Sequence, residues 1–199
     1  MKRKFWILLG GLVLVGAGCT ATPKVPDELS LTFEEPMAEP QSKTWEFPGV
    51  LSAEEIKGKQ VRVKTAKGEI VFELFADTAP KTVSNFVYLA AGGYYNGLMF
   101  HRREEGFVIQ GGDPSGNGTG GPGYTFEDEL KDGYAYERGI VAMANRGPHT
   151  NGSQFFIMLG DVPLPKLYSI FGRVTQGIEV VDQLQIGDVM EAVLIEARS

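Results

Sequence analysis

The sequence is poor in the residues from which disulfides and metal sites are built. It has one cysteine and two histidines among 199 residues. A single cysteine cannot form an internal disulfide, and two histidines without a second cysteine offer too few ligands for a structural zinc site. We therefore expect neither a metal nor another cofactor, so any chemistry must come from ordinary side chains.

Positive charge is also scarce. The formal net charge is -6 and the pI is about 5.0. Because this balance lacks the basic surface that binds a phosphate backbone, nucleic acid is not an expected partner. The remaining composition, with 43% hydrophobic and 22% charged residues, is typical of one globular domain with a buried core.

The N-terminus has a short apolar segment. Basic residues precede the run from Phe5 to Val15, which falls short of the about 20 apolar residues of a transmembrane helix, and small residues follow up to Cys19. Residues 1–19 therefore indicate an export signal. Because Cys19 directly follows Gly16-Ala17-Gly18, the segment resembles a bacterial lipoprotein signal, whose cysteine is lipidated. A plain cleaved signal and an uncleaved anchor with a free thiol are the alternatives, and both also export the chain.

Residues 20–58 are rich in proline and acidic side chains and show no sustained apolar period. We interpret them as an extended tether that lets a domain reach past lipid headgroups. One patch, Trp45, Phe47, Val50 and Leu51, is more apolar than a linker needs. It is either part of the tether or packed on the outside of the domain.

Residues 59–199 carry the patterns of a folded domain. Alternation from Val61 to Thr65 and from Ile70 to Leu74 predicts a β-hairpin. Thr78 as cap, Pro80 in the first turn and a 3.6-residue apolar period up to Gly92 predict an amphipathic helix. A short helix at Ile178–Leu184 is also expected. Further short strands are predicted at Leu98–His101, Phe107–Gln110, Ile140–Ala144, Phe155–Leu159, Ser169–Val174 and Glu191–Glu196, which indicates a closed β-barrel or a sandwich.

The stretch Gly111–Gly123 contains seven glycines. A phosphate-binding loop would end in Gly-Lys-Ser/Thr or stand within a βαβ unit, and neither pattern is present. We interpret it as a surface loop in which most glycines provide positive φ angles.

Two segments concentrate polar residues where a strand pattern predicts core. They are residues 100–113 (FHRREEGFVIQGGD) and residues 143–157 (MANRGPHTNGSQFFI). Together they resemble the cyclophilin family closely. The resemblance extends from about residue 59 to residue 197. Supporting blocks occur in the same order as in that family: Thr78–Val83, Asn117–Gly121, Phe126–Glu129 and Phe171–Val174.

The resemblance implies a mainly β fold, a closed eight-stranded antiparallel β-barrel capped by two α-helices, and peptidyl-prolyl cis/trans isomerase activity. It implies that Phe107, Val108, Phe156 and Leu164 hold the proline ring, and that Arg102, Gln110, Asn145 and Gln154 meet the peptide backbone. Gly118, Ala144 and Tyr168 would complete the substrate-binding surface.

These residue types suit the reaction because no covalent bond has to break. Amide resonance sets a rotational barrier of about 18–20 kcal/mol, and uncatalysed exchange at X-Pro bonds is slow. Selective stabilisation of the twisted amide is sufficient for catalysis. A guanidinium beside the ring can donate a hydrogen bond to the prolyl nitrogen or carbonyl and stays charged, so Arg102 is the candidate for this role.

Ordinary structural roles are also consistent with these residues. The aromatic residues could be ordinary core, and Arg102 could be a surface arginine paired with Glu104 or Glu105. His101 and His149 are expected to be structural or exposed, since no nucleophile accompanies them. A peptide-binding module without catalysis and a structural envelope protein are the alternatives to the enzyme.

Some positions depart from the usual family pattern. Charged residues replace an aliphatic stretch at Arg103–Glu105, and Arg146 adds charge at the rim of the groove. Pro163 and Tyr168 stand where many eukaryotic relatives have tryptophan and histidine.

Taken as a whole, the sequence predicts a monomeric, lipid-anchored foldase outside the cytoplasm that acts on proline-containing unfolded polypeptides.

Overall fold

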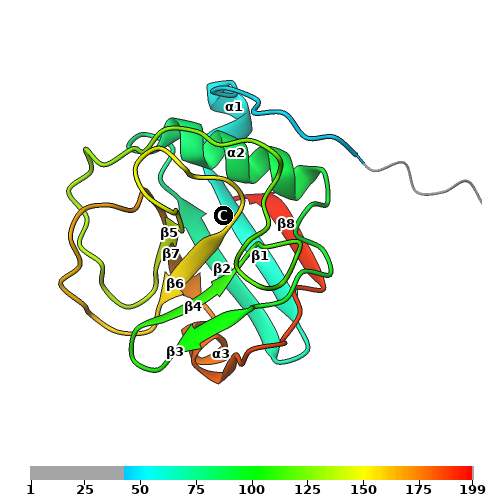
Figure 1. Ribbon diagram of the computed structural model, residues 1–199, viewed down its shortest axis with the longest axis vertical. Coiled ribbons are helices and arrows are strands. Elements are labelled where there is room, and N and C mark those ends of the chain that lie inside the picture. The colour runs from blue at the N-terminus through cyan, green and yellow to red at the C-terminus, as the bar shows by residue number, and fades with distance from the viewer. Residues whose placement is uncertain (1–42, 199) are drawn as a thin grey trace, which may run out of the picture. The chain divides into compact units, whose positions relative to one another are not determined.

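The structure, a computed structural model, describes residues 43–198. It contains an antiparallel sheet in the order β3-β4-β6-β5-β7-β2-β1-β8, curled so that α1 and α2 lie near one end and α3 near the other (Figure 1). The strands are β1 (Lys59–Thr65), β2 (Gly68–Leu74), β3 (Arg102–Glu104), β4 (Val108–Gly111), β5 (Ile140–Met143), β6 (Phe155–Met158), β7 (Ile170–Gln176) and β8 (Ala192–Ala197); the helices are α1 (Ala53–Ile56), α2 (Pro80–Ala91) and α3 (Ile178–Gln183).

The sheet is mainly as predicted, but it is not a closed barrel. The edge strands β3 and β8 do not pair. Backbone bonds join the segments that precede them instead, as Phe100 N–H donates to Asp188 O (2.8 Å) and Met190 N–H to Leu98 O (2.9 Å). The predicted strand at Leu98–His101 is accordingly reduced to a single bridge between Met99 and Val189. The prediction of a closed barrel with two helices is therefore wrong, because the edge strands are staggered and α1 adds a third helix among the described residues.

The β1–β2 hairpin is confirmed, and its alternation builds the main core. Val61 pairs with Phe72 and Val63 with Ile70, and all four side chains are buried. Phe72 meets Phe86 of α2 edge-on at 5.7 Å. Aromatic residues thus lock the hairpin to the helix.

Helix α2 begins differently from the prediction. Its N-cap residue is Ala79, and Thr78 makes no cap bond to the helix. The carboxylate of Glu129, from a distant loop, accepts hydrogen bonds from Lys81 N–H (3.0 Å) and Thr82 N–H (2.8 Å) instead. This carboxylate replaces the Thr78 cap and suits the positive end of the helix dipole.

The apolar patch before β1 packs on the domain. Trp45 contacts Tyr88 and Tyr94 edge-on, with ring centroids 5.5 and 5.3 Å apart, and Phe47 stacks on Phe126 at 5.1 Å. Of the two interpretations of this patch, packing on the outside of the domain is the one observed. The signal region with Cys19 lies outside the described residues. Within residues 43–198, no helix has both the length and the apolar content to cross a bilayer.

Candidate active site

A second hydrophobic cluster lies on the face of the sheet opposite the main core. The two-residue period of the strands divides their side chains: Ile109, Val141 and Ile157 face the main core, whereas Val108, Ala142 and Phe156 face the second cluster. Partly buried residues line its outer side: Phe75, Phe107, Tyr134, Ala144, Val162, Leu164 and Tyr168. The predicted ring-holding residues Phe107, Val108, Phe156 and Leu164 are therefore in one place.

Tyr168 forms one wall of this cluster. Its ring meets Phe156 edge-on at 5.5 Å, and its backbone N–H donates to the Tyr136 hydroxyl (3.0 Å). The Tyr136 hydroxyl in turn donates to Tyr168 O (2.8 Å). The position of Tyr168 is thus fixed by its contacts with Tyr136.

A line of polar side chains runs along the edge of the cluster. Arg102 Nη1 donates to Gln110 Oε1 (3.0 Å), and Gln110 Nε2 donates to Gln154 Oε1 (2.9 Å). Gln154 Nε2 donates to Gly118 O (3.1 Å) and Gly120 O (2.8 Å). Register explains the arrangement, because Gln110 lies opposite Arg102 on β3 and opposite Phe156 on β6.

Arg102 has a second, acidic partner. Its Nε and Nη2 both donate to Glu104 Oε1, with the Nε contact at 3.2 Å. The guanidinium carbon also lies 5.9 Å from the centroid of the Phe107 ring, within the range of a cation–π contact. The guanidinium is thus held along one edge, and N–H groups of Nη1 and Nη2 are left over for another acceptor. From the sequence, Glu104 was a partner of Arg102 only under the interpretation of Arg102 as a surface arginine.

Asp113 organises the glycine-rich loop. Its carboxylate accepts backbone N–H bonds from Ser115 (2.7 Å), Asn117 (3.0 Å) and Gly118 (2.5 Å). Burial works to raise the pKa of Asp113, but these three donors outweigh it and hold the pKa below its usual value. Gly112 precedes it with φ +84°, and a Cβ there would come within 2.3 Å of Ser153 O. Asp113 was missed as a site residue, although an acid before a glycine-rich loop was a usable signal.

Asn145 links two loops. Its Nδ2 donates to Leu167 O (2.8 Å), and its Oδ1 accepts from Gly147 N–H (3.3 Å). The side chain is thus engaged by the protein. The neighbouring Ala144 N–H donates to Gln154 O (2.9 Å), which places Ala144 and Asn145 beside Gln154.

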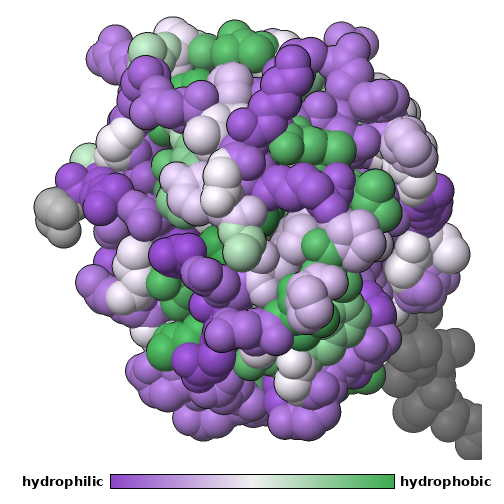
Figure 2. Space-filling model, turned by 90° about the vertical axis from the view of Figure 1, so that its left-hand side faces the viewer, coloured by the Kyte–Doolittle hydropathy of each residue, from purple (hydrophilic) through white to green (hydrophobic). Residues whose placement is uncertain are grey.

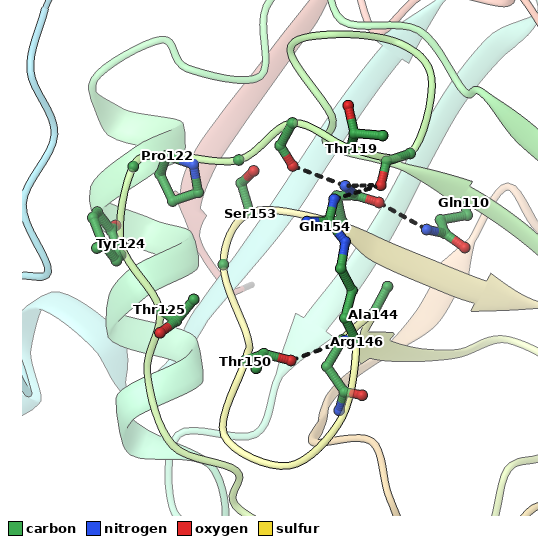
Figure 3. A pocket seen from close by; sticks show the side chains of 16 residues that line it. Gln110, Thr119, Pro122, Tyr124, Thr125, Ala144, Arg146, Thr150, Ser153 and Gln154 are labelled. Atoms are coloured by element: carbon green, nitrogen blue, oxygen red, sulfur yellow. Dashed lines mark hydrogen bonds between the residues drawn. The ribbon is translucent and has the colours of Figure 1, made fainter.

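A cavity of about 610 Å³ adjoins the polar line. Figure 3 shows Gln154, with Gln110 beside it, between the two loops that border the cavity. The predicted residues Gln110, Gly118, Ala144, Asn145 and Gln154 all contribute to its lining. Figure 2, which views the left-hand side of Figure 1, shows hydrophobic patches among hydrophilic side chains on that face.

The histidines lie as the sequence suggested. His149 is exposed, and its Nδ1 accepts the Asp128 backbone N–H at 3.1 Å. Burial lowers the pKa of the half-buried His101, which favours the neutral ring at neutral pH.

Comparison with known proteins identifies the family. Residues 60–197 match the family described as cyclophilin type peptidyl-prolyl cis-trans isomerase/CLD. The chain belongs to the cyclophilin family. A peptidyl-prolyl cis-trans isomerase of Helicobacter pylori is 43% identical over 78% of this chain and 96% of its own length. Peptidyl-prolyl cis-trans isomerase B of Bacillus subtilis is 48% identical over 64% of this chain and 91% of its own length.

Solved structures agree with the sequence comparison. A cyclophilin-type isomerase of Cryptosporidium parvum superposes with a TM-score of 0.67 and 38% identity, over 71% of this chain and 99% of that one. The same protein has been crystallised in the presence of the dipeptide Ala-Pro, and that structure superposes with a TM-score of 0.65. This cyclophilin is therefore a peptidyl-prolyl cis-trans isomerase with a mainly β fold.

Proposed function

We propose that the second cluster and the polar line together form the isomerase site. The proline ring lies against Phe107, Val108, Phe156 and Leu164, with Tyr168 as the side wall. Arg102 donates to the prolyl nitrogen or carbonyl as the amide twists. The observation that carries this proposal is the continuous set of hydrogen bonds from Arg102 through Gln110 to Gln154, along the edge of an apolar cluster.

The proposed catalysis is electrostatic. An apolar cup fixes the ring, and the guanidinium stabilises the lone pair that the nitrogen gains when resonance is lost. Gln110 and Glu104 hold Arg102 before the substrate arrives, so little reorganisation is needed during rotation. Ala144, Asn145 and Gln154 guide the flanking backbone, and Gly118 shapes the adjacent loop.

Binding to the cup is tested with Phe107→Ala, because Phe107 is only partly buried and its removal spares the core. We expect affinity for an Ala-Pro-containing peptide, followed by NMR shifts, to fall about tenfold, as the loss of much of an aromatic contact predicts. Leu194→Ala, at an exposed position of β8, is the control and should bind normally. Equal affinity in the folded Phe107→Ala protein would contradict the placement of the proline ring.

We infer further that the protein is exported and lipid-anchored through Cys19, and that as a monomer it isomerises X-Pro bonds in proteins outside the cytoplasm. The support is the basic, then apolar, then small-residue pattern of residues 1–19 and the acidic, proline-rich segment after it. In a bacterial host, the full chain should fractionate with membranes and carry a mass increase at Cys19. Cys19→Ser should abolish both. Unmodified Cys19 in the wild-type protein would contradict the anchor.

A further inference from the structure

The cavity beside the polar line lies next to the proposed proline site. Gln110, Gln154 and Ala144 border both the cavity and the hydrophobic cluster or its polar edge. A peptide with its proline in the cluster would therefore place a neighbouring residue at the cavity. An extended chain advances about 3.3 Å per residue, so that residue lies within a few positions of the proline.

Among the residues that the structure describes, Arg146 is the one charged residue in the lining of this cavity. The others are neutral: Gln110, Gly118, Thr119, Gly120, Gly121, Pro122, Gly123, Tyr124, Thr125, Ala144, Asn145, Thr150, Gly152, Ser153 and Gln154. The side chain of Arg146 is exposed and extends from its loop toward Gln154 and the opposite loop (Figure 3). The charge that the lining side chains themselves contribute is therefore positive.

Arg146 also differs from the other arginines in residues 43–198 in having no carboxylate partner. The rest all form ion pairs, namely Arg62, Arg102, Arg103, Arg138, Arg173 and Arg198. Arg146 Nη2 donates only to the carbonyl of Gly118 (2.7 Å), which Gln154 Nε2 also contacts. Most of its N–H groups, and its full charge, are left for a ligand.

A carboxylate is the chemical group that matches such a guanidinium, because the two can form paired, charge-assisted hydrogen bonds. Proximity of the proline site supplies the reason for a peptide to be there. We propose that Arg146 selects substrates with an acidic residue, aspartate or glutamate, near the isomerised proline. This inference rests on the proposed proline site and adds a substrate class to it.

The test uses the full chain and two matched series of proline peptides. Glutamate or glutamine is placed at each of the three positions before and after the proline, and kcat/KM is obtained from NMR exchange rates. We expect glutamate to be favoured about two- to fivefold at a position on one side, the range for exposed ion pairs. The preference should shrink in high salt because exposed charges are screened.

Charge reversal makes the test specific to Arg146. Arg146→Glu should invert the preference, so that a lysine peptide is favoured over the glutamate peptide at the same position. Lys59→Glu, which makes the same charge change on β1, should retain the wild-type ratio. A glutamate-to-glutamine ratio of one at every position, or a preference that survives in Arg146→Glu, would overturn the inference.

The glutamine series keeps the two proposals apart. Turnover of glutamine peptides without a glutamate preference overturns charge selection and leaves the proline site intact. Peptide affinities measured in parallel give the same ratio independently of turnover, so loss of catalysis in a variant does not obscure the result.

Discussion

At the scale of single residues, the proposed site depends most on the environment of Arg102. Glu104 and Gln110 hold its guanidinium from two sides, while the next arginine, Arg103, pairs with Glu105 and donates to Leu184 O. Two similar ion pairs, Arg102–Glu104 and Arg103–Glu105, thus lie at β3, each between residues two positions apart, and only the first touches the polar line. Two oppositely directed effects are at work, since Glu104 both orients the guanidinium and partly offsets its charge.

We expect orientation to dominate. Glu104→Ala should lower kcat/KM about three- to tenfold, because Arg102 loses a fixed acceptor along one edge. Glu104→Gln keeps an acceptor oxygen and should retain most of the activity. The matched control is Glu105→Ala, which removes the same charge one residue along and should change kcat/KM less than about twofold. Higher activity in Glu104→Ala would show that Glu104 restrains Arg102 and does not position it.

At the scale of elements, the start of α2 shows where local patterns stop being informative. The period of its apolar residues predicted the helix correctly, because burial on one face depends on sequence spacing alone. Its cap was predicted wrongly, because Glu129 lies 47 positions beyond Thr82 and no local rule connects them. The β1–β2 hairpin was predictable for the same reason as the helix, whereas the stagger of β3 and β8 depends on tertiary contacts.

The contact of Glu129 with the start of α2 leads to a prediction about stability. Glu129→Ala should lower the free energy of unfolding by about 1–2 kcal/mol, as for the loss of a strong N-cap. The midpoint temperature of thermal unfolding should fall by about 2–4 °C for each kcal/mol lost. Glu127→Ala serves as control, since within residues 43–198 its exposed carboxylate pairs only with the Lys81 side chain, and its midpoint should stay near the wild type. Equal midpoints for the two variants would contradict the cap.

At the scale of the whole molecule, one curled sheet separates the core from the proposed site. The strand period predicted that β4, β5 and β6 have two faces, but periodicity does not distinguish a second core from a binding surface. The resemblance to a family predicted a binding surface there and pointed to Arg102, Gln110 and Gln154 together. The resemblance did not predict the contacts that are peculiar to this chain. Examples are the bond from Arg102 to Glu104 and the bond from Arg146 to Gly118 O.

The central claim is that Arg102 stabilises the twisted amide, and NMR exchange of a proline peptide measures this most directly. With wild-type protein, cis and trans signals should exchange rapidly, and Arg102→Ala should slow the catalysed exchange by on the order of a hundredfold. Arg138→Ala is the matched control, because Arg138 is equally exposed (42% against 43%) and also paired with a carboxylate. Its exchange rate should equal that of the wild type. Undiminished exchange with a folded Arg102→Ala protein would contradict the account.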